Sequence, residues 1–309
     1  MELALITIRQ VFVLFILIGV GYIASRSGAI KTEARQHLSS LLVYVVVPCM
    51  ILNSYFSSFD PTVFRGIVLS FIHSFILIMI GLVLAMLLTK NMDKKNRPIL
   101  RFALVFSNAG YMGFPLIESL FGAEGLLYAS SYNTVFNIMI WTFGYAMVSG
   151  HIKLKEILHT VLTTPAIIAV PLGLTIYLTG ISIPAILQQP ISLIGAMNTP
   201  ISMIITGMII SSSDIKKLIK NINVLKVVGI RLILIPACCI LIYGLLHIDF
   251  GMASDVVLLL EACPCAAITS VFAIQFHYDE DLAAGSVVLS TLFSIVTLSI
   301  VSYIITSVI

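Results

Sequence analysis

The chain has 309 residues, of which 59% are hydrophobic and 10% are charged, and its mean hydropathy is +1.10. A water-soluble domain of this composition would have too few polar residues to cover its surface, so the composition indicates a membrane protein. The formal net charge of +3 is small and scattered, without the basic arm or acidic tail that would suggest nucleic-acid binding.

The apolar segments predict an all-α polytopic membrane protein. A spanning helix requires about 20 mainly apolar residues. The first segment lacks a basic N-terminal region and a clear cleavage pattern, so we expect it to be retained as a span. The length criterion divides the chain into about ten spans, at residues 4–24, 37–57, 63–89, 98–121, 126–149, 157–178, 185–212, 223–246, 253–276 and 284–307.

The connections between these spans differ in charge. The connections after the second, fourth, sixth and eighth spans contain almost no Lys or Arg. The connection at residues 277–281 is acidic, but Asp and Glu contribute weakly to membrane orientation. Because basic connections stay in the cytoplasm, we expect both termini outside the cell, with the protein crossing the cell (plasma) membrane many times. The basic residues follow the odd-numbered spans, at Arg26, Lys31, Arg35, Lys90, Lys94, Lys95, Arg97, Lys153, Lys155, Lys216, Lys217 and Lys220.

Prolines inside the apolar segments form two pairs at similar spacing. Pro48 and Pro200 are 152 residues apart, and Pro115 and Pro264 are 149 residues apart, about half the chain in each case. The spacing indicates an internal duplication, in which one structural unit occurs twice in the sequence. Five spans in each half require the second half to insert upside down, and such inverted repeats place their sites on helices interrupted near the membrane midplane. This arrangement is typical of transporters.

The fourth and ninth spans carry the predicted interruptions. Gly110, Gly113 and Pro115 follow Asn108 in the fourth span, and they lower its helix propensity, permit close backbone approach and remove a donor. The ninth span repeats the pattern more weakly around Glu261, Cys263, Pro264 and Cys265. The alternative is that each proline only kinks its helix. All five cysteines lie in apolar runs, so we interpret them as small buried residues and not as disulfide partners.

Several of these motifs together resemble the auxin efflux carrier family, which includes bacterial members and the plant PIN auxin transporters. The resemblance covers essentially the whole chain. The short connection at residues 150–156 is similar to the bacterial branch, so auxin is not the expected substrate. The motifs are the run Asn108–Pro115, Asn137 with Trp141, and Pro264 followed by Val271, Phe272 and Ala273.

The resemblance implies the fold of the bile acid sodium symporters (NhaA-like), in which the broken fourth and ninth spans cross. It also implies a mobile transport unit, moving as an elevator against a scaffold that commonly forms a homodimer. Substrates of the bacterial branch are small organic anions, such as mono- or dicarboxylates. In this chain the scaffold would comprise residues 1–60 and 151–221, and the transport unit residues 61–150 and 222–309.

The predicted crossover suits an anion, because helix N-termini offer free N–H groups and a partial positive charge. We expect Asn108 to contact the substrate, together with Gly110, Gly113, Pro115, Cys263, Pro264 and Cys265. The alternative for Asn108 is that it only satisfies freed backbone groups. Asn133 and Asn137 share one helix face. We expect that face to line the site, with bonding between helices as the alternative.

Glu261 is the most informative ionisable residue, because an acid deep in a span is costly and therefore a functional candidate. Desolvation would let it bind a proton. Equally, it would suit a sodium ion with Asn108 and Thr134, because oxygen ligands bind hard cations. Three possibilities for coupling stay open: transport coupled to a proton, transport coupled to sodium, and transport without a coupling ion. Glu261 as a neutral structural residue is the remaining alternative. His73 is expected to be satisfied locally, and Arg231 to extend to the inner membrane interface.

Glu118 and Asp255 are expected near the outer ends of their spans, as interface residues. The sequence therefore predicts a secondary active transporter of a small organic anion. No cofactor, resident metal or nucleic-acid partner is expected. A channel would show a filter or a fully polar span face, and an enzyme a catalytic constellation, and neither pattern is present in the sequence. A membrane receptor that binds a carboxylate without transporting it stays the alternative.

Overall fold

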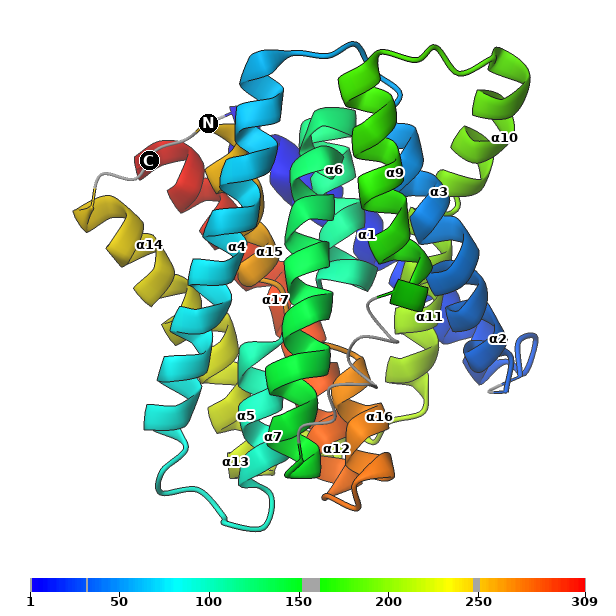
Figure 1. Cartoon of the computed structure of the whole chain (residues 1–309). Helices are drawn as coiled ribbons and strands as arrows, with labels where there is room; N and C mark the ends of the chain where they lie inside the picture. Colours follow the sequence, from blue (N-terminus) through cyan, green and yellow to red (C-terminus); the bar gives the residue numbers. More distant parts are fainter. Residues whose placement is uncertain (1, 32, 152–161, 247–250, 309) are drawn as a thin grey trace.

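In a computed structural model, the described residues, 2–31, 33–151, 162–246 and 251–308, form helices and no β-strand. Figure 1 shows them as a bundle. Four segments, marked η, have the wider π-helical turn. The elements are α1 (Glu2–Arg26), α2 (Ala34–Leu41), η1 (Leu42–Val46), α3 (Val47–Ser54), α4 (Pro61–Leu88), α5 (Arg97–Val105), η2 (Ala109–Gly113), α6 (Phe114–Met139), η3 (Ile140–Gly144), α7 (Tyr145–Ser149), α9 (Pro165–Thr179), α10 (Ala185–Gly195), α11 (Asn198–Ser211), α12 (Ile215–Ile219), α13 (Ile222–Gly229), η4 (Ile230–Leu234), α14 (Ile235–Leu245), α15 (Met252–Glu261), α16 (Ile268–Gln275) and α17 (Glu280–Val308).

Within the described residues, six helical segments are long and apolar enough to cross a membrane, and α9 is a shorter apolar helix. The start of the sixth predicted span lies outside the described residues. The fourth and ninth spans are broken, as predicted, into α5 with η2 and α6, and into α15 with α16. The prediction of an all-α polytopic membrane protein with two broken helices is confirmed. The six segments are Arg9–Arg26, Ala34–Ser54, Pro61–Leu88, Ala185–Ser211, Ile222–Leu245 and Glu280–Ile305.

A single glycine joins the fourth span to the fifth. Gly122 has φ +61° and ψ −149°, which are not helical angles. The chain therefore changes direction at Gly122, between two helical parts of α6. This region of backbone space is essentially restricted to glycine. The first part of α6 therefore completes the fourth span, and the part after Gly122 forms most of the fifth.

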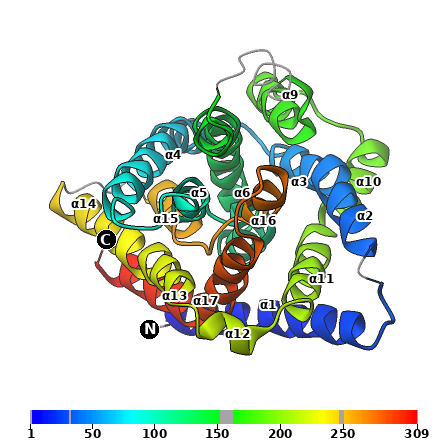
Figure 2. The same cartoon turned by 90° about the horizontal axis from the view of Figure 1, so that it is seen from below.

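The helices pack in two groups (Figure 2). In one group α1 packs on α11, and α3 packs on α9 and α10. In the other, α4 packs on α6 and α15, while α17 packs on α13 and α16. Contacts also run between the groups, because α1 packs on α17 and both α1 and α3 pack on α6. The division into units that move relative to each other stays a prediction.

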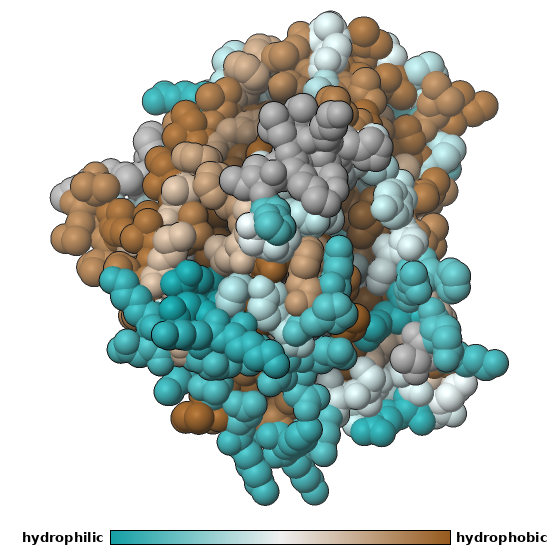
Figure 3. Space-filling view, turned by 60° about the horizontal axis from the view of Figure 1, so that its bottom comes forward, coloured by the Kyte–Doolittle hydropathy of each residue, from teal (hydrophilic) through white to brown (hydrophobic). Residues whose placement is uncertain are grey.

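The two ends of the bundle differ in polarity. Hydrophilic side chains gather on the end that carries the connection between α4 and α5, as Figure 3 shows. Both chain termini lie at the opposite end (Figure 1). This arrangement fits the predicted topology, although which end faces the cytoplasm stays a prediction. The exposed lysines at the polar end include Lys90, Lys94, Lys95, Lys216 and Lys217.

Glycines bring the backbones of α1 and α11 into contact. A Cβ placed on Gly207 would lie 2.1 Å from the carbonyl oxygen of Ile18, and one on Gly21 would lie 2.3 Å from that of Ile204. Small residues at helix crossings are a main source of packing in membranes, because lipid offers no hydrophobic driving force between helices. The contact therefore depends on the two glycines.

We expect Gly207→Ala to weaken this packing, because the added methyl group meets backbone atoms that cannot move aside. Overpacking of this kind costs about 1–3 kcal/mol. The measurement is the apparent Tm of the purified protein in detergent. Gly19→Ala, on the partner helix α1, is the control, because its added Cβ meets no atom within 4 Å. Equal melting of the two variants would contradict the close packing of α1 on α11.

Candidate functional site

The two broken spans cross at their interruptions and bind each other through the backbone. Ser107 and Cys265 form an isolated antiparallel bridge. The Asn108 N–H donates to the Pro264 carbonyl at 2.7 Å, and the Ala266 N–H donates to the Phe106 carbonyl at 2.9 Å. The extended residues thereby satisfy groups that a helix break would leave unpaired in a nonpolar medium.

The bridge corrects the predicted pairing of the prolines. Ser107 and Cys265 are the residues that face each other, and Pro264 lies within the break beside them. Pro115 lies beyond η2, at the start of α6, so it does not occupy the matching position. The glycines Gly110 and Gly113 lie in η2, and the extended residues at the break are Phe106 and Ser107. Proline spacing alone was therefore a poor guide to register.

The C-terminal ends of α5 and α15 both point at Arg231 of η4. The Arg231 Nη1 donates to the Leu104 carbonyl at 2.8 Å and the Val105 carbonyl at 3.3 Å. Its Nε donates to the Cys263 carbonyl at 3.1 Å, and its Nη2 donates to the Glu261 carbonyl. A helix C-terminus carries unpaired carbonyls and a partial negative charge. One guanidinium thus satisfies both ends.

Arg231 also forms an ion pair with Glu261, with Nη1 and Oε1 3.0 Å apart. Both side chains are essentially inaccessible, with 0% and 1% of their surface exposed. The expectation that Arg231 extends to the membrane interface is therefore wrong. The physical reason is that five acceptors at the crossover surround its guanidinium, which compensates the charge inside the bundle.

Tyr132 of α6 connects this ion pair to the bridge. Its hydroxyl donates to Glu261 Oε2 at 2.8 Å, and the Ser107 hydroxyl lies 2.9 Å from it. One helical turn further, Phe136 packs edge-on against Phe106, with ring centroids 5.6 Å apart. Tyr132 was not predicted as a site residue. Its one signal in the sequence is a phenol hydroxyl next to Asn133, in the polar stretch of the same helix.

The N-terminal ends of η2 and α16 lie on the other side of the break and are less satisfied. Asn108 precedes η2 and is 4% exposed, yet its side-chain amide makes no hydrogen bond within the described part of the chain. The N–H groups of Ala109, Gly110 and Tyr111 are likewise unpaired among the described residues. A Cβ on Gly110 would meet no atom within 4 Å, so space is open there.

Two further groups border this open side. Tyr111 lies beside Ser39 of α2, close enough to Arg35 for its positive charge to act on the phenol. Thr269, in the first turn of α16, is buried and its hydroxyl has no partner among the described residues. The open side therefore combines unpaired donors with a nearby cation, whereas Arg231 occupies the other side.

The other predicted residues occupy different places. Asn137 donates to the Asn133 carbonyl at 2.7 Å and Thr134 to the Ser130 carbonyl at 2.9 Å, so both bond within α6. No described bond brings these three side chains to the crossover. Cys263 and Cys265 are buried in the break. A Cβ on Gly113 would lie 2.5 Å from Leu260, so this glycine permits η2 to pack on α15.

His73 is buried on α4, with its ring edge-on to Tyr243 at 5.4 Å between centroids. Glu118 is partly buried and accepts a hydrogen bond from Thr199, and its place near the outer membrane interface stays a prediction. No group of three His, Cys, Asp or Glu side chains suited to a metal ion occurs in the described residues.

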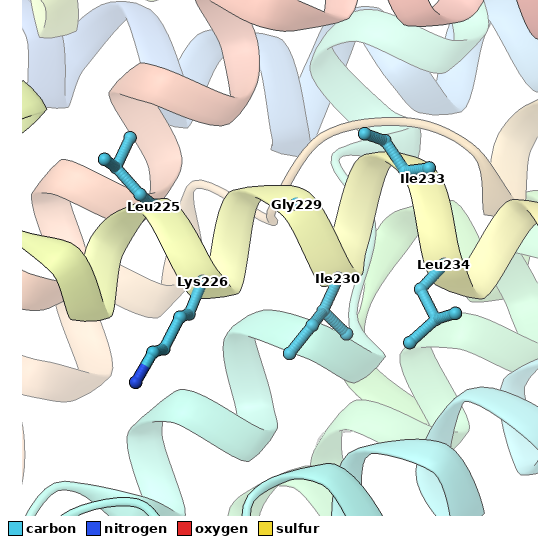
Figure 4. A pocket seen from close by; sticks show the side chains of 6 residues that line it. All are labelled: Leu225, Lys226, Gly229, Ile230, Ile233 and Leu234. Atoms are coloured by element: carbon cyan, nitrogen blue, oxygen red, sulfur yellow. The ribbon is translucent and has the colours of Figure 1, made fainter.

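A groove elsewhere on the surface follows α13 and η4. Figure 4 shows Lys226, Ile230 and Leu234 on one side of the helix and Leu225 and Ile233 on the other, with Gly229 between them. The lining is apolar apart from Lys226, and Ile233 is 64% exposed. A surface of this kind suits lipid acyl chains, so the crossover is the better candidate for a functional site.

Comparison with known proteins decides the family. The sequence profile of the membrane transport protein family matches residues 6–157 and matches again over residues 151–302. The chain belongs to this family. It is the auxin efflux carrier family, so the resemblance seen in the sequence is confirmed. Two successive matches of one profile also fit the predicted duplication.

Two archaeal relatives in the membrane transport protein family match nearly the full chain. One is an uncharacterised transporter of Methanocaldococcus jannaschii, 25% identical over 96% of this chain and 98% of its own. The other is an uncharacterised transporter of Methanothermobacter thermautotrophicus, 25% identical over 94% of this chain and 95% of its own. With the family and the apolar helices, these matches show a multi-pass membrane transport protein.

Proposed function

We propose that this protein is a secondary active transporter of a small organic anion, a mono- or dicarboxylate, bound at the crossing of α5–η2 with α15–α16. The observation that carries the proposal is the asymmetry of the crossover. The C-terminal helix ends are neutralised by Arg231, while the N-terminal end of η2 keeps unpaired N–H groups beside the unpartnered amide of Asn108. Such a site attracts negative charge.

The same residues indicate which chemical class of ligand fits the site. The open space at Gly110 lets a ligand approach the backbone closely, and Asn108 offers both a donor and an acceptor. Arg35 stands near this side and would favour an anion over a neutral ligand. A carboxylate can accept hydrogen bonds from the free N–H groups and the Asn108 amide, without an Arg or Lys side chain in direct contact with it.

The proposed movement is an elevator. Helices α4–α7 and α13–α17 would move together, carrying the crossover past a scaffold of α1–α3 and α9–α11. Support comes from the packing of α1 on α11 and of α3 on α9 and α10, with α2 and η1 in contact with α11 between the two sets. We propose that the scaffold forms a homodimer in the cell membrane, with both termini outside the cell. A proton or a sodium ion is the proposed coupling ion.

Counterflow separates transport from the alternative, a receptor that binds a carboxylate without moving it. Proteoliposomes are loaded with one unlabelled anion, malate, malonate, lactate or pyruvate, and diluted into the labelled form of the same anion. We expect transient accumulation of label for at least one of them. Indole acetate serves as a test of the auxin-like substrate, for which we expect none. Binding of an anion without any counterflow would support the receptor and contradict the carrier.

A further inference from the structure

The ion pair with Arg231 changes where a coupling proton would bind. Glu261 accepts from Arg231 and from Tyr132, so both carboxylate oxygens have donors, and its negative charge has a partner 3.0 Å away. Protonating it would leave Arg231 buried without a counter-charge, which is strongly unfavourable. Glu261 is therefore a fixed part of the crossover. A coupling proton requires another carboxylate.

Glu118 is a second carboxylate set within a span. It lies in the first part of α6, about one turn before the exposed residues Gly122 and Ala123. Its Oε2 accepts a hydrogen bond from the Thr199 hydroxyl of α11 at 3.1 Å. This bond joins a helix of the proposed transport unit to a helix of the proposed scaffold. Glu118 is thus both near an exposed turn and part of the contact between the units.

No cation compensates Glu118 within the described residues. It forms no ion pair there, it is partly buried, and its described hydrogen-bond partner is the Thr199 hydroxyl. Of the elements packed against α6, α11 and η3 contain no charged residue. Titratable groups on these elements and on α6 itself are Arg9, Tyr22 and Arg26 on α1, Cys49 on α3 with Tyr55 after it, Arg65 and His73 on α4, Tyr111 on η2, Glu124, Tyr128 and Tyr132 on α6, Tyr177 on α9, and Asp255 and Glu261 on α15.

The neighbour of Thr199 supplies an independent observation. Asn198 is fully buried, and neither its Nδ2 nor its Oδ1 has a hydrogen-bond partner among the described residues. Buried amides are nearly always paired, and an unpaired one marks a place for water or for a group brought in by movement. The contact between α6 and α11 thus holds polar groups whose bonding is incomplete.

We propose that Glu118 is the group that takes up and releases the coupling proton in each transport cycle. This inference rests on the proposed function. Water at the exposed turn delivers a proton to a Glu118 carboxylate oxygen, removing a charge from the interface between the units. The neutral acid moves with α6 away from Thr199. On the other side of the membrane the proton returns to water, which restores the carboxylate. One carboxylate with one hydroxyl offers too few oxygen ligands for sodium.

The test compares counterflow with accumulation driven by a pH gradient in the same proteoliposomes. The anion used is whichever of malate, malonate, lactate and pyruvate shows counterflow in the wild-type protein. Glu118→Gln mimics the protonated acid and keeps an acceptor for Thr199. We expect it to retain counterflow within about threefold, since exchange needs no net proton movement. Accumulation driven by an imposed pH gradient, and proton uptake reported by an internal pH dye, should fall at least tenfold.

Glu124→Gln is the matched control, because Glu124 lies on the same helix but is bonded within it by the Tyr128 hydroxyl at 2.6 Å. It should leave both forms of flux unchanged. Undiminished pH-driven accumulation in Glu118→Gln would overturn the proposal, and so would loss of counterflow in a variant that is correctly folded. Wild-type accumulation that does not respond to the imposed pH gradient would also overturn the proposal, while leaving the carrier intact. Absence of wild-type counterflow would overturn the carrier itself.

Discussion

Replacing Arg231 by Met should destabilise the protein more than any other single change in the crossover. The change leaves Glu261 as an uncompensated buried charge and removes the donor to the carbonyls that end α5 and α15. Breaking a buried ion pair by removing one partner costs about 3–5 kcal/mol. For a chain of this size that corresponds to a fall in apparent Tm of roughly 10 °C. Transport should be lost as well.

Two comparisons make this expectation specific. Lys226→Met removes an exposed cation from the same span and should leave the apparent Tm unchanged. Arg231→Met combined with Glu261→Gln removes both charges, so it should be more stable than Arg231→Met alone. A double-mutant cycle measured by thermal unfolding gives the coupling between them. An Arg231→Met protein that melts like the wild type would show that the ion pair does not hold the crossover together.

Replacing Asn108 by Ala should weaken anion binding and transport at least tenfold with little effect on stability. The Asn108 side chain makes no hydrogen bond in the described structure, so its removal leaves no partner unsatisfied. If the amide binds a carboxylate, its loss removes a hydrogen bond to a charged group, worth about 1.5–3 kcal/mol. We expect at least a tenfold weaker affinity for the transported anion, measured by ligand-dependent thermal stabilisation. Counterflow should fall in proportion.

Asn137→Ala is the matched control for this experiment. It removes an amide of the same type that is bonded within α6 to the Asn133 carbonyl, and no described contact ties it to the crossover. It should therefore keep its affinity for the anion. Asn108→Asp should bind more weakly than Asn108→Ala, because it adds a negative charge beside the ligand. Unchanged affinity in Asn108→Ala would remove Asn108 from the binding site.

The fold could be predicted from the sequence because a bilayer imposes strict rules on it. Each span must be about 20 residues of apolar sequence, and breaks within spans need polar or small residues, as at Asn108 and Gly110 and at Pro264. The duplication followed from spacing. The register of the crossover did not, because Pro115 lies beyond the break, where the helix runs on from η2 into α6, and so does not mark the interruption.

The residues that act through distant partners were harder to predict. Arg231 and Glu261 are 30 positions apart, and each alone is ambiguous, since an Arg near a helix end can extend to the interface. Two opposite charges in otherwise uncharged spans were a signal for pairing, because neither is stable alone in lipid. Tyr132 gave no such signal, since a buried phenol is common and its partners come from two other spans.

Charge movement on a solid-supported membrane tests the central claim most directly. Proteoliposomes receive a rapid pulse of the anion that shows counterflow, at matched and at opposed pH, with and without sodium. We predict a transient current that is present in the wild type, absent in Asn108→Ala and retained in Asn137→Ala. A current of equal size in Asn108→Ala, or none in any protein that binds the anion, would contradict a carrier whose substrate binds at the crossover.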